Sequence, residues 1–253
     1  MELLLINHPL DCPICDQAGE CGLQDQYMKF GQYDPEMAER KVKKRKVVDL
    51  GERVVLDTER CILCSRCVRF TDEITETSEL GIFNRGDRSE IGTFEDKPLN
   101  NKYSVNTVDI CPVGALTSKD FRFKQRVWFL KDKPSVCTGC STGCNVDVYH
   151  NNEGVWRLKP HYNPEVNGYW MCDEGRDIYK HVNLAHTEVV GDRGEKEVKR
   201  TLSRLTQASR TISGQKEFMD ISFAMEQVGT QLKSYDKKNV SLVITGQSTV
   251  EEL

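Results

Sequence analysis

Long apolar runs are missing from this sequence, and so are the short motifs that bind nucleotides. The longest apolar run near the start spans Leu3 to Ile6, which is far too short to cross a bilayer. Glu2 stands where a secretory signal would carry basic residues. The chain contains neither GxGxxG nor GxxxxGKS/T, and no Ser/His/Asp constellation can be argued. We therefore expect a cytoplasmic protein without nucleotide binding or acyl transfer of its own.

A strong charge of either sign is also lacking. The 253 residues carry a net charge of -4 and are 38% hydrophobic, and the mean hydropathy is -0.55. These values are typical of a soluble globular chain of one or two domains. They show no excess of positive charge of the kind that binds nucleic acid. The stretch "ERKVKKRKVVD" places six basic residues between Arg40 and Lys46. It predicts a solvated face or a flexible basic loop, with a docking patch for an acidic partner as the alternative.

Cysteine is abundant, but it is absent after Cys172. The chain has eleven cysteines, an odd number that suits a disulfide framework poorly. Clustered CxxC spacings in a reducing compartment favour metal binding instead. Residues beyond Cys172 form a different compositional region, so the metal chemistry is expected to end there.

The cysteines fall into three groups, and one histidine completes the count. The groups have the spacings HxxxCxxCxxxxxC, CxxCxxC with a distant cysteine before proline, and CxxCxxxC with a distant cysteine. Together they give twelve candidate ligands in three sets of four: His8, Cys12, Cys15 and Cys21; Cys61, Cys64, Cys67 and Cys111; Cys137, Cys140, Cys144 and Cys172.

Either zinc or iron-sulfur clusters could use these residues. Structural zinc sites usually present paired knuckles, whereas each group here offers three ligands from one loop and a fourth from elsewhere. The sequences "CILCSRC" and "DICPVGAL" reproduce the bacterial ferredoxin pattern, which favours a [4Fe-4S] cluster. The third group favours a cluster less strongly. In the first group, three cysteines and a histidine also make an ordinary zinc set, so spacing alone leaves both metals open.

Local patterns predict several structural elements. "VVLDTERCILCSRCVRFTDEI" is typical of a strand that enters a ligand loop and leaves as a helix. "NVDVYHNNEGVWRLKP" predicts a β-hairpin with Val146, Val148, Val155 and Leu158 facing inward. A second hairpin is expected to turn at Asp192 to Gly194.

The last part of the chain predicts a helix and then the opening of a βαβ unit. Ile221, Met225, Val228 and Leu232 follow helical spacing. "VSLVITG" suits a buried strand, and Ser248 with Glu251 forms a capping box for a further helix. Because a lone strand has no partner here, we expect a truncated polypeptide or one completed by another chain.

Five motifs in register resemble a known family. "INHPLDCPICDQAGECGLQD", "ERCILCSRCVRF", "DICPVGAL", "CTGCSTGC" and "NGYWMCDEGR" are similar to the large iron-sulfur subunit, the G subunit, of NADH-quinone oxidoreductase (respiratory complex I). The resemblance runs from about Leu4 to Asn183. It implies three [4Fe-4S] clusters on the three sets above, with His8 as an iron ligand. The third set is similar to an extra cluster found in some bacterial members, so the resemblance implies a bacterial source.

The resemblance also implies an α+β fold in three parts. Residues 1–130 would form a bacterial-ferredoxin-like domain with two clusters, residues 131–187 a small, mostly β [4Fe-4S] domain, and residues 188–253 the start of a truncated, molybdopterin-oxidoreductase-like α/β domain. Family members begin with a [2Fe-2S] domain and end with a large molybdopterin-oxidoreductase-like domain. This chain would lack the first and most of the second, and no molybdopterin is expected.

The implied function is electron relay from a flavin-bearing subunit through the clusters toward quinone. The chain would be an electron-transfer subunit without a substrate site of its own, and downstream iron-sulfur subunits would be further partners. It would lie at the cytoplasmic face of the inner membrane, touching the membrane only through those partners. The alternatives are the equivalent subunit of a NAD-linked hydrogenase or formate dehydrogenase and, less favoured, a zinc-stabilised interaction module.

Overall fold

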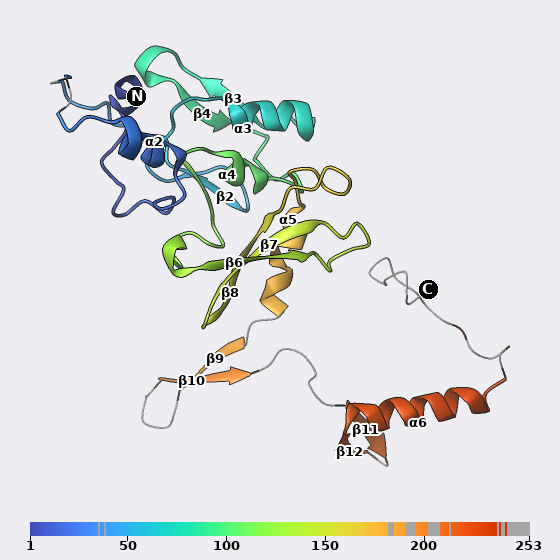
Figure 1. Ribbon diagram of the computed structural model, residues 1–253. Coiled ribbons are helices and arrows are strands. Elements are labelled where there is room, and N and C mark those ends of the chain that lie inside the picture. The colour runs from blue at the N-terminus through green and yellow to red at the C-terminus, as the bar shows by residue number, and fades with distance from the viewer. Residues whose placement is uncertain are drawn as a thin grey trace. The chain divides into compact units, whose positions relative to one another are not determined.

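A computed structural model describes residues 1–34, 36–37, 39–181, 185–190, 196–201, 208–212, 214–236, 238 and 241. Contacts divide the chain into two units. The first comprises Met1–Cys137 and Thr142–Asp177, and the second comprises Thr138–Ser141 and Ile178–Leu253. The chain contains both short helices and short strands, which give it an α+β fold (Figure 1).

The first unit holds the elements of the ligand region. They are, in chain order, α1 (Glu2–Leu5), α2 (Gly22–Phe30), β1 (Val48–Asp49), β2 (Val54–Leu56), α3 (Arg66–Arg69), the π-helical turn η1 (Phe70–Ile74), β3 (Leu80–Phe83), the 3₁₀ turn η2 (Gly86–Arg88), β4 (Glu90–Thr93), α4 (Asn106–Ile110), β5 (Leu116–Ser118), the 3₁₀ turn η3 (Val127–Phe129), β6 (Lys131–Val136), β7 (Asn145–Asn151), β8 (Gly154–Pro160) and α5 (Asp173–Asp177).

Small antiparallel sheets organise this unit. One has the strand order β1-β2-β5, another pairs β3 with β4, and a third has the order β6-β7-β8. The β-branched residues of β2 favour a strand, and all three of its side chains are buried. The predicted strand, ligand loop and helix are confirmed, because β2 leads into the CxxCxxC loop and then into α3 and η1.

The predicted hairpin at residues 145–160 is also confirmed. Asn151 pairs with Gly154, whose φ of 146° allows the tight turn that joins β7 to β8. Val146 and Leu158 are buried as expected, whereas Val148 and Val155 are only partly buried.

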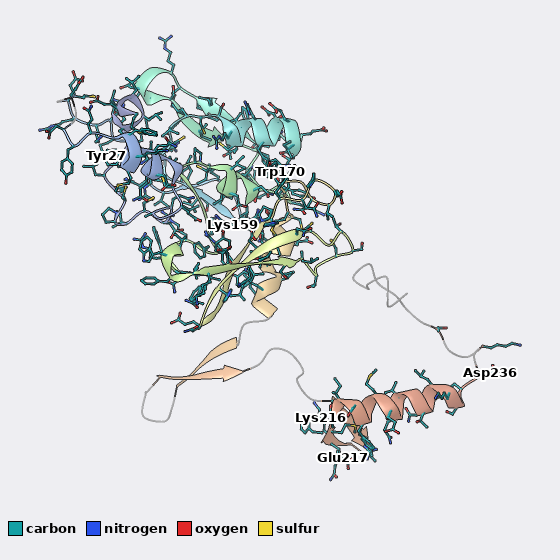
Figure 2. All side chains as sticks on the ribbon, viewed as in Figure 1. Tyr27, Lys159, Trp170, Lys216, Glu217 and Asp236 are labelled. Atoms are coloured by element: carbon teal, nitrogen blue, oxygen red, sulfur yellow. The ribbon has the colours of Figure 1, made fainter. Side chains whose placement is uncertain are left out.

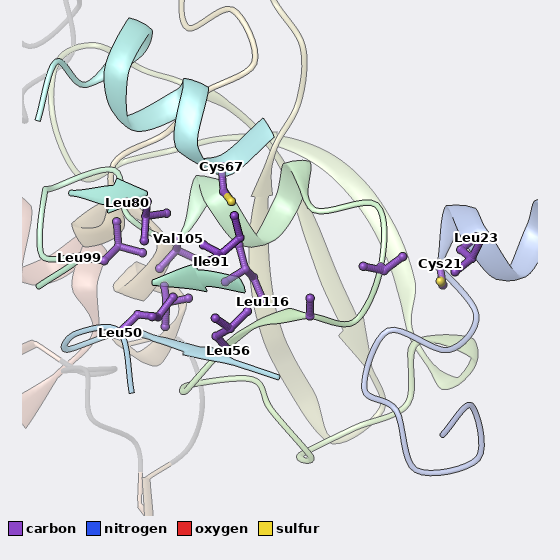
Figure 3. Close-up of a cluster of buried hydrophobic side chains, with 13 residues drawn as sticks. Cys21, Leu23, Leu50, Leu56, Cys67, Leu80, Ile91, Leu99, Val105 and Leu116 are labelled. Atoms are coloured by element: carbon purple, nitrogen blue, oxygen red, sulfur yellow. The ribbon is translucent and has the colours of Figure 1, made fainter. Parts of the chain in front are cut away.

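Apolar side chains from the β1-β2-β5 sheet, β3, β4 and the flanking loops form one core. Figure 3 shows this cluster, which also contains Cys21 and Cys67. Its members are Cys21, Leu23, Leu50, Val54, Leu56, Cys67, Leu80, Ile91, Leu99, Val105, Val113, Ala115 and Leu116. Two of the candidate ligands are therefore held by the same packing that holds the sheets.

The second unit is described by itself. It contains the 3₁₀ turn η4 (Ile178–His181), the antiparallel hairpins β9 (Ala185–Val190) with β10 (Lys196–Thr201) and β11 (Ala208–Ile212) with β12 (Gln215–Met219), and α6 (Ile221–Ser234). Asp220 caps α6 by accepting a hydrogen bond from the Ser222 amide at 2.8 Å.

Two predictions for the second unit are confirmed and three lie outside the described residues. The helix expected from Ile221 onward is α6, and the expected second hairpin has β9 and β10 as its strands. Its turn at Asp192 to Gly194, and the strand and helix predicted after residue 239, fall where the structure is not described. Within the described part of the chain, no helix has both the length and the apolar character that a bilayer crossing requires.

Candidate metal centres

The first ligand set surrounds one cavity. His8, Cys12, Cys15 and Cys21 come from the segment between α1 and the start of α2, and all four line one small cavity. The remaining lining residues are Asp11, Ala18, Gln24, Arg60 and Gly114. The cavity therefore contains the three thiols and the imidazole that the sequence grouped together, and one buried cation.

Burial favours the uncharged forms of His8, Cys15 and Cys21 in this cavity. It lowers the pKa of His8, with Arg60 and Lys41 adding to the shift. Burial likewise raises the pKa of the Cys15 and Cys21 thiols, and the nearby Cys12 adds to both shifts. Among the described residues, His8 Nδ1 is one of the buried nitrogen atoms without a hydrogen-bond partner. A neutral imidazole with an unpaired nitrogen is a suitable metal ligand.

Gly114 allows the chain to approach Cys15 closely. A Cβ atom built at Gly114 would lie 2.2 Å from Cys15 Sγ and 3.0 Å from the Gln17 Cβ. While Cys15 Sγ keeps its position, no side chain fits at residue 114, so the first site requires glycine at this residue. Gly22 differs, because a Cβ at that position would meet nothing closer than the Pro112 carbonyl oxygen at 3.5 Å.

The second ligand set surrounds a separate cavity. Cys61, Cys64, Cys67 and Cys111 all line this second small cavity. Six of the other lining residues are apolar, namely Leu56, Ile62, Ile91, Val113, Ala115 and Leu116, and two are polar, namely Ser65 and Arg66. Four cysteines that line a mostly apolar cavity fit a buried cluster, in which apolar walls limit access by water.

The loop of the second set turns through the left-handed region of backbone space. Leu63 has a φ of 55° and Ser65 a φ of 59°. These conformations are uncommon for residues other than glycine. The Leu63 amide donates a hydrogen bond to Cys61 Sγ at 3.4 Å. The loop therefore wraps around its own cysteines before α3 begins.

The thiols of the second set affect one another's ionisation. Burial, followed by repulsion from the other cysteines of the set, raises the pKa of Cys67 to about 12. Burial also raises the pKa of Cys111 to about 11, with Cys61 and Cys64 contributing. Thiolates packed this closely in an apolar cavity need a cation to balance them, which iron would supply.

The third ligand set is brought together in part. The Cys137 amide donates to the Cys144 carbonyl oxygen at 2.8 Å. A Cβ built at Gly175 would lie 3.2 Å from Cys137 Sγ and 3.3 Å from Cys172 Sγ, so two sulfur atoms converge on this glycine of α5. Cys140 is exposed and belongs to the second unit, and its participation stays a prediction.

The donor chemistry of the sets fits iron-sulfur clusters. Thiolates, with one imidazole in place of a thiolate in the first set, are the ligands that such clusters use. In the part of the chain that the structure describes, no three His, Cys, Asp or Glu side chains are arranged around a single metal ion. The fit rests on the two cavities, the unpaired nitrogen of His8 and the close approach at Gly114.

The first and second sites meet at Pro112. The Gly22 amide donates to the Pro112 carbonyl oxygen at 3.0 Å, and Cys21 Sγ lies 3.7 Å from the same oxygen. Cys21 belongs to the first set and Pro112 follows directly after Cys111 of the second. The two ligand loops are therefore in direct contact.

Strand β8 anchors the first loop from another direction. Glu20, which precedes Cys21, accepts hydrogen bonds from both Nη atoms of Arg157 at 2.9 and 2.7 Å. Lys159, labelled in Figure 2, donates to the same carboxylate at 3.0 Å. A paired guanidinium and carboxylate fix both distance and orientation, so the position of Cys21 depends on the β7–β8 hairpin.

Asn106 ties the Cys172 segment to α4. Its side chain is fully buried, donates to the Met171 carbonyl oxygen at 2.8 Å and accepts from the Met171 amide at 3.2 Å. It also accepts from Arg176 Nη2 at 2.9 Å. Asp173 binds Ser104 Oγ at 2.7 Å and the Val105 amide at 3.1 Å. These bonds hold both neighbours of Cys172 against the helix that leads to Cys111.

Replacing Asn106 by leucine is expected to lower the free energy of unfolding by about 3 kcal/mol. The substitution removes the side-chain partner of the buried Met171 amide and carbonyl, and such unpaired groups cost about 1–3 kcal/mol each. It also removes one hydrogen bond of Arg176, which keeps its ion pair with Asp109. Urea denaturation followed by circular dichroism would measure the loss. The exposed Asn152 gives a matched control, for which Asn152→Leu should change stability by less than about 0.5 kcal/mol. Equal stability of the two variants would contradict the role of Asn106.

The basic segment at residues 40–46 holds the histidine-bearing segment in place. Lys41 Nζ donates to the carbonyl oxygens of Leu5 and Ile6 at 2.8 and 2.9 Å. Lys44 Nζ donates to the Ser89 carbonyl oxygen at 2.6 Å. The expectation of a solvated face is therefore wrong for Lys41 and Lys44. Sequence reasoning missed this role because the carbonyl partners lie up to 45 residues away.

Family models match three parts of this chain. The model described as "NADH-ubiquinone oxidoreductase-G iron-sulfur binding region" matches residues 1–36, and "NADH-quinone oxidoreductase subunit 3, ferredoxin-like domain" matches residues 51–117. "Molybdopterin oxidoreductase Fe4S4 domain" matches residues 130–184. Each matched region contains one of the three candidate ligand sets.

Curated proteins are similar over most of this chain. The G subunit of NADH-quinone oxidoreductase from Streptomyces coelicolor is 47% identical over 176 residues, which are 70% of this chain and 21% of the relative. The G subunit from Mycobacterium tuberculosis is 43% identical over 198 residues, 77% of this chain and 25% of the relative. The mitochondrial NADH dehydrogenase [ubiquinone] iron-sulfur protein 1 of Solanum tuberosum is 47% identical over 71% of this chain and 24% of the relative. The chain thus spans about a fifth to a quarter of the length of these relatives.

A solved structure is similar at a lower level. A chain of a NAD+-reducing [NiFe]-hydrogenase in the H2-reduced state matches with 26% identity over 50% of this chain and 55% of that chain. The TM-score of 0.43 is too low to establish a common fold.

Proposed function

We propose, for a chain that belongs to the family of NADH-quinone oxidoreductase G subunits, that it is an electron-relay subunit carrying three [4Fe-4S] clusters. Electrons would arrive from a flavin-bearing subunit and continue toward quinone through downstream iron-sulfur subunits. These partner subunits would hold the chain at the cytoplasmic face of the inner membrane. The proposal needs neither a substrate site in this chain nor molybdopterin.

The proposed ligands are the twelve residues grouped by the sequence. His8, Cys12, Cys15 and Cys21 would hold the first cluster, Cys61, Cys64, Cys67 and Cys111 the second, and Cys137, Cys140, Cys144 and Cys172 the third. The observation that carries the proposal is that the first two sets each line a cavity of their own and that these two sets touch at Pro112. The clusters would supply one-electron chemistry at potentials that the surrounding residues adjust.

The chain's own residues would bind, shield and connect these centres. The apolar wall of the second cavity limits the access of water. The amides of Gln24 and Gly175 donate to Cys21 Sγ and Cys172 Sγ at 3.5 and 3.3 Å, and such bonds to sulfur stabilise negative charge. The finer domain arrangement is part of the same proposal: a ferredoxin-like part at residues 1–130, a β-rich part at 131–187, and the start of a molybdopterin-oxidoreductase-like part at 188–253.

Metal and sulfide analysis tests the function. We expect anaerobically purified chain to be brown and to contain about twelve iron atoms with matching acid-labile sulfide, since each four-ligand set takes four irons. Reduction should produce paramagnetic signals in EPR spectra. Zinc without labile sulfide would refute the proposal and support a zinc-stabilised interaction module.

Co-purification then tests the assembly. A tagged chain expressed in its own host should retain a flavin-bearing subunit and a subunit with a quinone site. Retention of a nickel-iron or formate-oxidising subunit instead would agree with the relay function but would assign the chain to a different complex.

A further inference from the structure

A buried arginine forms part of the wall of the first cavity. Arg60 is only 5% exposed and lines the same space as His8 and the three cysteines of the first set. It also directly precedes Cys61, the first ligand of the second set. A guanidinium keeps its positive charge at any accessible pH, so this cavity contains a permanent cation.

Two carboxylates hold this cation in place. Asp11 Oδ2 accepts hydrogen bonds from Arg60 Nε at 3.2 Å and from Nη2 at 3.0 Å. Asp57 Oδ2 lies 3.2 Å from Arg60 Nε, and Lys46 forms ion pairs with both of these carboxylates. Asp11 itself lines the cavity and precedes Cys12. One positive and one negative side chain therefore reach the first site together.

The charge of Arg60 acts on the candidate ligands. Burial works to lower the pKa of Arg60, but interactions with Cys15, Asp11 and Asp57 together raise that pKa above its usual value. Arg60 also contributes to the lowered pKa of His8. The guanidinium is thus close enough to influence both a thiol and the imidazole of the first set.

We propose that Arg60 and Asp11 set the reduction potential of the first site in opposite directions, Arg60 raising it and Asp11 lowering it. This inference rests on the proposed function, because it requires a cluster at that site. One-electron reduction adds one negative charge to the cluster and its ligands. A nearby cation favours the reduced form and a nearby anion disfavours it, and burial preserves both effects because little water screens them.

Arg66 provides the matched comparison. It lines the second cavity, as Arg60 lines the first, but its side chain is exposed and its Nη1 atom donates only to the Ile110 carbonyl oxygen, at 3.5 Å. Solvent screens an exposed charge, so Arg66 should have little influence on the potential of either site.

The test is a redox titration, followed by EPR, of the full-length chain with reconstituted clusters. In Arg60→Met, we expect the ratio of reduced to oxidised first-site cluster at a fixed solution potential to fall about tenfold, which corresponds to a shift of about 59 mV for one electron. Asp11→Asn should raise the ratio, by a smaller factor because Asp11 is partly exposed. Arg60→Lys should retain most of the original ratio, and Arg66→Met should change the ratio at either site less than twofold.

The signs of the shifts separate tuning from simple positioning. Both Arg60→Met and Asp11→Asn break the same ion pair, so a purely structural role would move the potential in one direction in both variants, and that result would overturn the inference. If Arg60→Met fails to assemble the first cluster, Asp11→Asn decides: a raised potential supports the inference, and an unchanged or lowered one overturns it. Absence of iron and labile sulfide in the unaltered chain would instead refute the proposed function, and this inference with it.

Discussion

Replacing Gly114 by alanine is expected to empty the first site and to leave the second and third occupied. The new Cβ would need the place of Cys15 Sγ, which lies 2.2 Å from its built position. Displacing that sulfur removes one of four ligands and blocks part of the cavity. Iron analysis should show a loss of about four of the expected twelve atoms per chain, and the EPR signal of the first site should disappear.

Gly22 supplies the control for this substitution. It lies beside Cys21, but a Cβ there has its nearest neighbour at 3.5 Å, an ordinary contact. Alanine also suits the first turn of α2 better than glycine does. Gly22→Ala should therefore keep all its iron. Full occupancy of the first site in Gly114→Ala would show that Cys15 does not bind where the structure places it.

Metal binding at the second site is expected to strengthen by at least about a hundredfold for each unit of pH, and to keep doing so above pH 9. In the metal-free chain the raised pKa values, about 12 for Cys67 and about 11 for Cys111, keep both thiols protonated. A metal binds the thiolates, so each of these thiols releases one proton on binding, and each proton contributes a factor of ten per pH unit. The effect persists until the pH reaches the raised pKa of Cys111.

Cobalt titration of the metal-free chain between pH 7 and pH 10.5 would measure this dependence, with a competing chelator to set the free Co²⁺ concentration. Ordinary thiols have a pKa of about 8.5, so their contribution would level off near pH 9. Cys67→Ala should lower the slope to about tenfold per unit in the upper range. A plateau near pH 9 in the unaltered chain would show that burial does not raise the pKa values of Cys67 and Cys111 before metal binds.

Most of the candidate ligands could be grouped from the sequence because their spacing is local, whereas Cys111 and Cys172 lie far from the rest of their sets. Cys61, Cys64 and Cys67 lie within seven residues, and the strand before them and the helix after them follow from short patterns. The hairpin of β7 and β8 is equally local, since its turn and its alternating side chains lie in one stretch. Such features depend on neighbours in the chain, which a single sequence displays directly.

The residues that shape the sites could not be found in this way. Arg60 reaches Asp11, Gly114 accommodates Cys15, and Asn106 binds Met171 only after folding. Each of these pairs spans 49 to 99 residues, with no pattern to connect its members. The one available signal was position: Arg60 directly precedes a ligand, and Gly114 lies in the "DICPVGAL" motif. The membership of Cys140 in the third set stays a prediction.

The contact between the two ligand loops has a consequence for electronic coupling. From Cys21 Sγ, a route runs along the backbone to the Gly22 amide, crosses the 3.0 Å hydrogen bond to the Pro112 carbonyl, and returns along the backbone to Cys111 Sγ. All its other steps are covalent bonds. The rate at which an electron tunnels between two metal centres falls less steeply along covalent bonds than across empty space. This one main-chain hydrogen bond would then provide a tunnelling pathway between the first and second proposed clusters. Because it uses only main-chain atoms, side-chain substitutions leave it in place.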